Sequence, residues 1–378
     1  MQLIFGVQKM NIIVIAGGLS PERDVSLSSG SMIANALMEY GHNVLLMDIY
    51  MGLRGADNFQ DAYTRYKKDK YEYTIPAREP DLDALRAARG GMGGMGGMGG
   101  QGGMCVQLPR EQQIGDGVLS ICAGADIVFN ALHGAIGENG QIQAVFDVYG
   151  VKYTGTGYEG SFLAMDKPLA KELMRLNGIR TPDWTVMSAG GAKNIDDLNF
   201  IPGSIGLPCV IKPCGCGSSV GVSIVNNRDE MAAALDYAFK YESRIIIEKM
   251  IMGREFSVGV LGGAALPPIE IIPREGFFDY KNKYQPNATV EVCPPAGLSR
   301  DAEMEMRDLA LRAHEILRLG DYSRLDLILS DDNLIYCLET NTLPGMTPAS
   351  LLPKEAAAGG IAYPQLCDRI VRLAMERY

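Results

Sequence analysis

The chain of 378 residues is long enough for two or three domains with ample hydrophobic cores. Its formal net charge of −10 excludes a general nucleic-acid or anionic-membrane surface, so we expect neither partner. No uninterrupted apolar run reaches the roughly 18 residues of a membrane span, and eight irregularly spaced cysteines indicate reduced thiols in a cytoplasmic protein.

The first ordered segment reads as a strand, a glycine-rich turn, a helix and a second strand. Residues 11 to 16 form a continuous apolar run, which is typical of a parallel strand covered on both faces. Helical spacing runs from Ser26 to Tyr40, Gly41 ends it, and "NVLLMDI" follows as a strand. This pattern predicts a βαβ unit at the start of the chain.

Residues 51 to 120 differ in composition from the rest of the chain. They are polar and then pass into "RGGMGGMGGMGGQGGM". Glycine at this density makes a helix or strand entropically costly, so we predict a disordered loop over residues 88 to 104. A surface insertion is the simple interpretation, and a Met-bearing element that binds a partner is the alternative.

Regular structure is predicted again from Asp126 to the end of the chain. A strand to Leu132 ends in His133-Gly134, and a helix follows from about Gly140. A helix is predicted over Lys167–Asn177, and a strand, a glycine loop and a strand in "LPCVIKPCGCGSSVGVSIVNN". A helix in "DEMAAALDYAFKY" and strands in "RIIIEKMI" and "EFSVGVL" follow. Residues 264–345 are predicted to be mostly strands, interrupted by a helix over Asp301–Leu319, and a last helix spans Tyr363–Arg377.

Two pairs of polar residues have the two-residue spacing of one strand face. Arg324 and Asp326 form one pair, and Glu339 and Asn341 form the other. With a four-residue connection of residues 331–334, Asp326 would lie opposite Glu339 and Arg324 opposite Asn341. A three-residue connection without a bulge would instead put the two pairs on opposite faces.

If the pairs meet, three oxygen ligands and one guanidinium share a small area. Adjacent carboxylates need a cation, and Asp, Glu and Asn oxygens without a soft ligand suit Mg²⁺ or Mn²⁺. The "LPGM" that follows would fix a backbone N–H beside them. The alternative is a solvated or salt-bridged pair of strands.

A glycine loop supplies candidate phosphate contacts. Lys212 ends a strand, and the loop of residues 215–221 offers backbone amides and the hydroxyls of Ser218 and Ser219. A plain β-turn explains the same loop equally well. Lys167, at the start of a predicted helix, is a second candidate cation.

Together these elements resemble the ATP-grasp ligases and, within them, the D-alanine–D-alanine ligases. The resemblance covers nearly the whole chain except residues 51 to 120, and its motifs occur in the family's order: "GGLSPERDVSLSSG", "LHGAIGENGQIQ", "YTGTG", "MDK", "KPCGCGSSVGV", "EKMIMGREF", "IEIIPREGFFDYKNKY", "SRLDLIL" and "LETNTLPGMTPASLLP". It implies an α/β (α+β) ATP-grasp fold of three domains. A Rossmann-like N-terminal domain would span 1–155, and the two ATP-grasp subdomains 156–252 and 253–378.

The resemblance also implies roles for individual residues. The implied ATP contacts are Lys167, Lys212, Ser219, Glu248, Lys249, Ile251 and Glu255, and the implied ligands of two Mg²⁺ or Mn²⁺ ions are Asp326, Glu339 and Asn341. Glu22 and His133 would hold the first D-alanine. Lys283 and Ser350 would hold the carboxylate of the second amino acid. Arg324 and the Gly345 N–H would stabilise the tetrahedral intermediate. Ser218, Tyr284 and Glu22 would form a hydrogen-bonded set beneath a lid at "GFFDYKNKYQPN".

The implied function is ATP-dependent joining of two D-alanines through an acyl phosphate, for peptidoglycan precursors, by a cytoplasmic homodimer. Tyr284 favours D-alanine at the second position, but D-alanine–D-lactate and D-alanine–D-serine ligases remain alternatives. A nucleotide-binding regulator without turnover is a further alternative. Cys214 and Cys216 flank Gly215, so we also hypothesise that their oxidation impairs closure of the loop over ATP.

Overall fold

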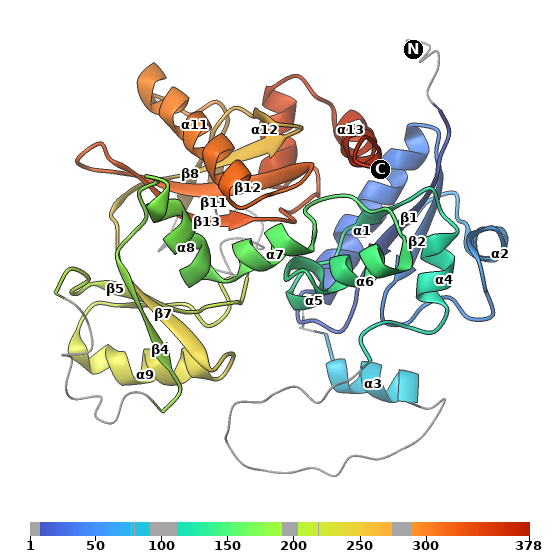
Figure 1. Cartoon of the computed structure of the whole chain (residues 1–378), viewed down its shortest axis with the longest axis horizontal. Helices are drawn as coiled ribbons and strands as arrows, with labels where there is room; N and C mark the ends of the chain where they lie inside the picture. The colour runs from blue at the N-terminus through green and yellow to red at the C-terminus, as the bar shows by residue number, and fades with distance from the viewer. Residues whose placement is uncertain are drawn as a thin grey trace.

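The computed structural model describes residues 8–76, 78, 80–90, 112–190, 203–217, 219–273 and 289–378 (Figure 1). The predictions for the Gly/Met tract from residue 91, for Ser218 and for Lys283 and Tyr284 lie outside the described residues. Within the described ranges, no helix is long and apolar enough to cross a membrane.

A parallel sheet forms the N-terminal part of the chain. Its strands are β1 (Asn11–Ala16), β2 (Asn43–Asp48) and β3 (Ile127–Asn130), in the order β2-β1-β3. Helix α1 (Arg23–Glu39) connects β1 to β2, which confirms the predicted βαβ unit. Helix α1 packs closely on β1, because a Cβ at Gly30 would lie 2.7 Å from that of Ala16.

Both faces of this sheet are covered, as the continuous apolar run of β1 predicts. On one face α1 packs beside the last helix, α13 (Tyr363–Met375), and buries Ile12 and Val14. The other face buries Ile13 and Ile15 beneath α2 (Phe59–Tyr66), α4 (Val118–Ala123) and α6 (Gln141–Tyr149). Figure 1 shows these helices around the strands. The β1–α1 loop leaves the sheet at the carboxyl ends of its parallel strands, and this end of the sheet carries part of the site.

The start of the predicted disordered loop is helical. Helix α3 (Leu82–Gly90) includes residues 88–90, so the prediction of disorder from residue 88 is wrong for these three residues. The Asp81 carboxylate accepts the Ala84 N–H at 2.9 Å and caps the helix. At the other end Arg89 donates to the Gln112 and Ile114 carbonyls at 2.7 and 2.9 Å, which ties the helix to the chain beyond residue 111.

A small antiparallel sheet follows in the middle of the chain. Its order is β4-β7-β5-β6, from β4 (Trp184–Ser188), β5 (Cys209–Pro213), β6 (Ser223–Val225) and β7 (Arg244–Lys249). Helix α9 (Arg228–Phe239) covers one face and encloses a separate hydrophobic core. The opposite face is left for the site, and the glycine loop joins β5 to β6.

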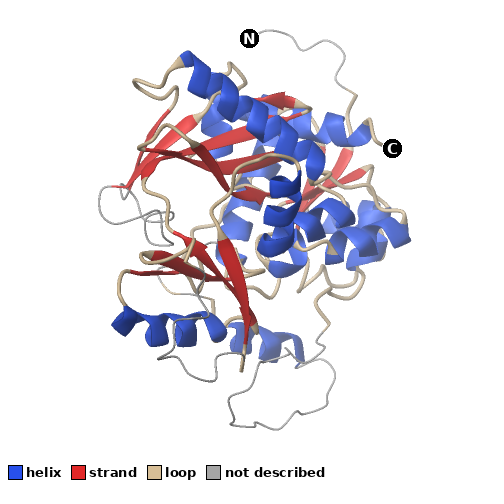
Figure 2. Cartoon of the chain, turned by 60° about the vertical axis from the view of Figure 1, so that its left-hand side comes forward, coloured by secondary structure: helices blue, strands red, loops and turns tan. Residues whose placement is uncertain are grey.

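The largest sheet belongs to the C-terminal part. Its order is β11-β10-β8-β12-β13, with β9 (Ala264–Ala265) paired to β8; the others are β8 (Gly253–Leu261), β10 (Ile269–Pro273), β11 (Thr289–Val292), β12 (Tyr322–Ser330) and β13 (Ile335–Asn341). One face packs on α11 (Arg300–Ile316) and α8 (Lys167–Leu176). Figure 2 shows this sheet and the smaller one as separate layers. The domain boundaries at residues 155 and 252 stay a prediction.

The register of β12 and β13 brings the two polar pairs together. Arg324 lies opposite Asn341 and Asp326 opposite Glu339, as predicted. The four-residue connection does not set this register by itself, because Leu329 rather than Ser330 pairs with Ile335. A bulge beside Asp326 shifts the register by one residue and restores the predicted pairing.

Candidate active site

A cavity of about 450 Å³ lies between the small sheet and the large sheet. Its walls come from the ends of β5 and β7, the hinge at residues 250–252, and β8, β10, β12 and β13. All seven predicted ATP contacts and two predicted metal ligands line it: Lys167, Lys212, Ser219, Glu248, Lys249, Ile251, Glu255, Asp326 and Glu339. Apolar side chains such as Val210, Ile224 and Leu338 complete the walls, a mixture that suits a nucleotide.

Lys212 reaches this cavity from the end of β5. Its Nζ lies 3.0 Å from Oε2 of Glu248 on β7, and Oε1 of the same carboxylate lies 3.2 Å from Nζ of Lys171. Lys171 was missed by the sequence analysis, although it follows Lys167 by one helical turn on α8. The Glu248 carboxylate is therefore engaged by two lysines.

The glycine loop closes one side of the cavity. Lys167 donates from Nζ to the Cys216 carbonyl, and the Gly215 N–H donates to the Glu242 carboxylate at 2.6 Å. Burial raises the pKa of the Cys214 thiol to about 12 and that of Cys216 to about 11. Both stay protonated at neutral pH, so the structure gives no support to oxidation of this pair as a control of loop closure.

The polar pairs of β12 and β13 form a tight cluster at the floor of the cavity. Arg324 donates two hydrogen bonds to the Asp326 carboxylate, both 2.8 Å, and the Asn341 amide donates a third at 2.9 Å. Burial opposes the charge of Arg324, but the Asp326 carboxylate raises the pKa of the guanidinium above its ordinary value. The guanidinium and the carboxylate therefore form an ion pair with two parallel hydrogen bonds.

The same cluster fits a hard divalent cation. Asp326 and Glu339 face each other across the strands, and the Asn341 amide lies beside them. Among the described residues there is no group of three or more His, Cys, Asp or Glu side chains suited to a metal ion. Two carboxylates with one carboxamide match an ion such as Mg²⁺, which keeps much of its shell for water and phosphate oxygens.

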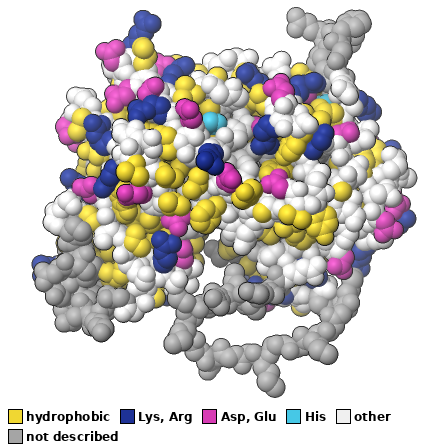
Figure 3. Space-filling model, in the orientation of Figure 1, with side chains coloured by type: hydrophobic (Ala, Val, Ile, Leu, Met, Phe, Trp, Pro, Cys, Tyr) yellow, Lys and Arg dark blue, Asp and Glu magenta, His cyan; other side chains and the backbone are white. Residues whose placement is uncertain are grey.

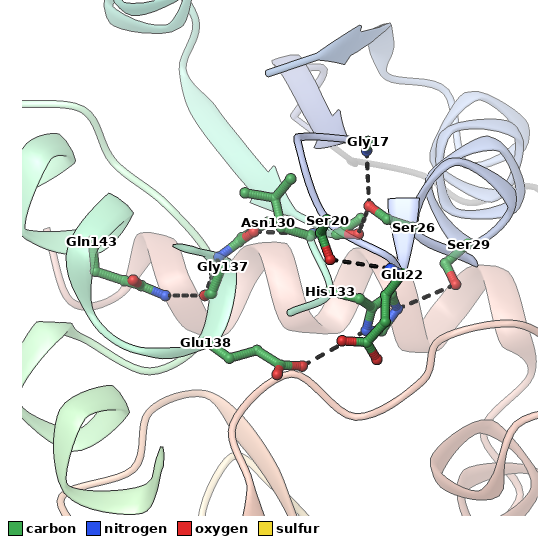
Figure 4. Close-up of polar contacts among 12 residues, drawn as sticks. Gly17, Ser20, Glu22, Ser26, Ser29, Asn130, His133, Gly137, Glu138 and Gln143 are labelled. Carbon is green, nitrogen blue, oxygen red and sulfur yellow. Dashed lines mark hydrogen bonds and ion pairs between the residues drawn. The ribbon is translucent and has the colours of Figure 1, made fainter. Parts of the chain in front are cut away.

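A second polar cluster lies at the carboxyl ends of the strands of the N-terminal sheet (Figure 4). Glu22 comes from the β1–α1 loop, His133 follows β3, and Glu138 ends the short helix α5 (Ala135–Glu138). His133 places Nδ1 3.8 Å from Glu138 Oε1 and Nε2 3.5 Å from Ser29 Oγ. The positive φ of Gly134 makes this turn, and a Cβ there would lie 2.5 Å from Ser20 Oγ.

Glu138 was missed by the sequence analysis, and it shares the charges of this cluster. Burial raises the pKa of the Glu138 carboxyl, the Glu22 charge acts in the same sense, and His133 and Lys167 oppose both. Burial alone would lower the pKa of His133, but Glu138 and Glu22 raise it above its usual value. The carboxyl groups of Glu22 and Glu138 beside the His133 imidazole make a buried pocket that favours a bound cation.

The two clusters adjoin each other. A Cβ at Gly217 of the glycine loop would lie 3.5 Å from Glu138 Oε2, and the charge of Arg324 acts on His133. Gly345 and Ser350 lie together at the end of β13, where a Cβ on Gly345 would be 2.9 Å from Ser350 Oγ. The Ser350 hydroxyl is held by Thr347, whose N–H donates to it at 3.2 Å. A carboxyl group bound between the two clusters would lie near the guanidinium of Arg324 and the imidazole of His133.

Comparisons with known proteins agree with this arrangement. A family model described as the D-ala D-ala ligase N-terminus matches residues 11–156, and one described as the D-ala D-ala ligase C-terminus matches residues 173–372. A D-alanine–D-alanine ligase of Pediococcus pentosaceus is 39% identical over 96% of this chain and 97% of the relative. That of Lacticaseibacillus casei is 38% identical over 98% and 97%.

Solved structures show the same likeness. The D-alanine–D-alanine ligase from Bacillus anthracis superimposes with a TM-score of 0.69 at 31% identity, covering 97% of this chain and 98% of that one. The same enzyme complexed with ATP gives a TM-score of 0.68 at 27% identity, with the same coverage.

The parallel opening sheet and the two sheets that enclose a lysine-lined cavity therefore make up an ATP-grasp fold. More narrowly, the chain belongs to the D-alanine–D-alanine ligase family.

Proposed function

We propose that this protein joins two molecules of D-alanine to D-alanyl-D-alanine, with ATP converted to ADP and phosphate, for peptidoglycan precursors. The names of its relatives support this activity. The observation that carries it is the meeting of Asp326 and Glu339 at the floor of a cavity that Lys167 and Lys212 also line. Two carboxylates and two ammonium groups there suit a nucleotide triphosphate with its metal.

The first step activates the carboxylate of the first D-alanine. Its ammonium group would lie in the pocket of Glu22, His133 and Glu138, whose carboxylates attract a cation. A carboxylate oxygen attacks the γ-phosphorus, the bond to the β-phosphate oxygen breaks, and ADP leaves with that electron pair. Lys167 and Lys212 neutralise the phosphates, and Glu255 and the backbone at residues 248–251 would hold the ribose and adenine.

We infer that Asp326, Glu339 and Asn341 hold Mg²⁺ or Mn²⁺, with two ions as the family resemblance implies. When bound, the metal neutralises phosphate charge and orients the γ-phosphoryl group. The choice of residues is supported by their hard oxygen donors and their shared strand face. Arg324, which donates two hydrogen bonds to Asp326, would turn toward the reacting carboxyl group.

The second step forms the peptide bond. The amine of the second D-alanine attacks the acyl phosphate, and phosphate leaves with one oxygen of the original carboxylate. Arg324 and the Gly345 N–H would stabilise the tetrahedral oxyanion, and Ser350 would hold the second carboxylate. Lys283 keeps its predicted role beside Ser350 at the carboxylate of the second D-alanine. Ser218 and Tyr284 keep their predicted roles in closing the site against water, which would otherwise hydrolyse the acyl phosphate.

Product analysis tests this function directly. Purified protein is supplied with ATP, Mg²⁺ and D-alanine, alone or with D-lactate, D-serine or L-alanine, and the products are identified by mass. We expect D-alanyl-D-alanine from D-alanine alone. If the main product is the ester with D-lactate or a mixed dipeptide with D-serine or L-alanine, the same site has another ligase activity. Nucleotide binding without turnover would favour a regulator.

Replacing Glu138 with Gln should weaken binding of the first D-alanine. The substitution removes one of two carboxylates in the ammonium pocket while keeping its size, so we expect the KM of the first D-alanine to rise by about 10-fold or more. The dissociation constant for ATP should stay unchanged, because Glu138 lies outside the cavity lining. Glu159→Gln, an exposed charge removal on α7, is the control. An unchanged KM for D-alanine contradicts the prediction.

Replacing Glu339 with Gln should weaken metal binding. One of two carboxylate ligands is lost, so the dissociation constant for Mn²⁺ in the presence of ADP should rise at least about 10-fold, as measured by calorimetry or paramagnetic resonance. Asp332→Asn removes an exposed charge from the same hairpin and should leave the constant unchanged. Equal Mn²⁺ affinity in both variants would remove Glu339 from the ligand set.

We also infer a cytoplasmic homodimer. The seven cysteines in the described ranges are free thiols, as a reducing compartment requires. Four apolar side chains on α6 and the adjacent α7 (Tyr158–Met165) are exposed: Val148, Tyr149, Tyr158 and Phe162. Figure 3 shows apolar side chains gathered near the middle of this face. Sedimentation of the full chain should give twice the monomer mass, and a Val148→Glu, Phe162→Glu variant should be monomeric if this surface forms the interface.

A further inference from the structure

A buried lysine beneath the nucleotide cavity has no part in the reaction described above. Lys171 lies on α8, one turn beyond Lys167, and its side chain is only 1% exposed. Its Nζ donates to Thr181 Oγ1 at 2.5 Å and lies 5.5 Å from the centre of the Trp184 ring. Lys171 is outside the lining of the cavity, so any effect on a nucleotide must pass through another residue.

Glu248 connects Lys171 to the cavity. One carboxylate oxygen is 3.2 Å from the Lys171 ammonium, and the other is 3.0 Å from that of Lys212, which lines the cavity. Burial pushes the pKa of Glu248 upward, but the charges of the two lysines hold it below its ordinary value. The carboxylate is therefore ionised and shared between two cations.

The count of charges gives Lys171 a specific consequence. With Lys171 present, two ammonium groups share one carboxylate, and these three side chains together carry one net positive charge. Burial lowers the pKa of Lys171, and the Glu248 charge opposes that shift and favours the ammonium form. Without Lys171, Glu248 and Lys212 form a neutral pair, and the carboxylate draws the Lys212 ammonium away from the phosphates. Because the group is buried, solvent screens this attraction little.

We propose that Lys171 is a positioning residue for the nucleotide: it neutralises Glu248 and so leaves the charge of Lys212 available to the phosphates of ATP. The inference rests on the proposed function only in taking ATP as the ligand of the cavity. Its test is a binding measurement without D-alanine, so failure of ligation and failure of this inference are separate results.

The test compares Lys171→Met with Lys171→Met combined with Glu248→Gln. Calorimetry of the full chain with MgATP should show at least a 10-fold weaker affinity for the single variant, and the double variant should recover most of it because Lys212 no longer faces an unshared carboxylate. Adenosine, which lacks phosphates, should bind the wild type and Lys171→Met equally. Lys240→Met, which removes an exposed cation from the end of α9, should match the wild type.

A purely structural role for Lys171 gives different results. Adenosine and ATP would then weaken together, and the double variant would be as weak as the single variant or weaker. If Lys171→Met alone does not fold, the double variant is compared with Glu248→Gln. The inference requires equal ATP affinity in these two, because Lys171 acts only through the carboxylate; a further loss on removing Lys171 would overturn it.

Discussion

Replacing Arg324 with Met is expected to lower kcat for dipeptide formation by about 10²–10³-fold, the usual effect of removing one donor to a developing oxyanion. Arg324 is positioned by Asp326, with two hydrogen bonds of 2.8 Å, and lies beside the pocket that contains His133. Met keeps much of the volume and loses the charge. Single-turnover measurement of dipeptide formation at saturating ATP and D-alanine gives the rate directly.

The same substitution should also make stability depend more strongly on metal. Without Arg324 the buried Asp326 faces Glu339 with no guanidinium beside it, which costs about 3 kcal/mol for a buried pair that loses one partner. Binding of Mg²⁺ or Mn²⁺ to these carboxylates should offset part of the loss, so the variant gains more in Tm from metal than the wild type does. Arg228→Met, at the exposed start of α9, is the control. Unchanged kcat would remove Arg324 from the reaction.

Replacing Glu355 with Gln is expected to stabilise the protein at pH 8 by about 3 kcal/mol. Glu355 lies on α12 (Leu351–Ala358), is fully buried, and accepts the Gly259 N–H at 2.6 Å. Burial raises the pKa of the carboxyl from 4.5 to about 7. The folded state therefore binds a proton that the unfolded chain has released, and the wild type loses stability as pH rises from about 4.5 to about 7.

The Gln side chain keeps an oxygen for the Gly259 N–H and has no ionisation to suppress. Urea denaturation of both proteins should give equal free energies of unfolding near pH 4.5 and the full difference above pH 7. Glu305→Gln, an exposed charge removal on α11, controls for the overall charge. A difference between Glu355→Gln and wild type that does not change with pH would show that the pKa of Glu355 is the same in the folded and unfolded chain, and would contradict the prediction.

Local patterns made much of this site predictable. The two-residue spacing of Arg324 and Asp326, and of Glu339 and Asn341, fixes each pair to one strand face, and the structure confirms that the pairs meet. Their register depends in addition on a bulge at the non-polar residue between Cys337 and Glu339. The sequence has no glycine or proline there to mark it.

Long-range contacts explain what the sequence analysis missed. Lys171 and Glu138 have the spacing of ordinary helical or turn residues. Lys171 gains its charged partner Glu248 from β7, and Glu138 gains the charges of His133 after β3 and Glu22 from the β1–α1 loop. The start of α3 was missed for a different reason. The glycine tract dominated the composition of that region, although Asp81 was available as a helix cap.

The fate of a carboxylate oxygen tests the proposed reaction most directly. D-Alanine labelled with ¹⁸O in its carboxyl group is incubated with the full chain, ATP and Mg²⁺, and the dipeptide and phosphate are analysed by mass. Attack on the γ-phosphorus predicts D-alanyl-D-alanine together with phosphate that carries one ¹⁸O. Dipeptide with unlabelled phosphate would contradict the acyl phosphate, and the absence of dipeptide would contradict the ligase itself.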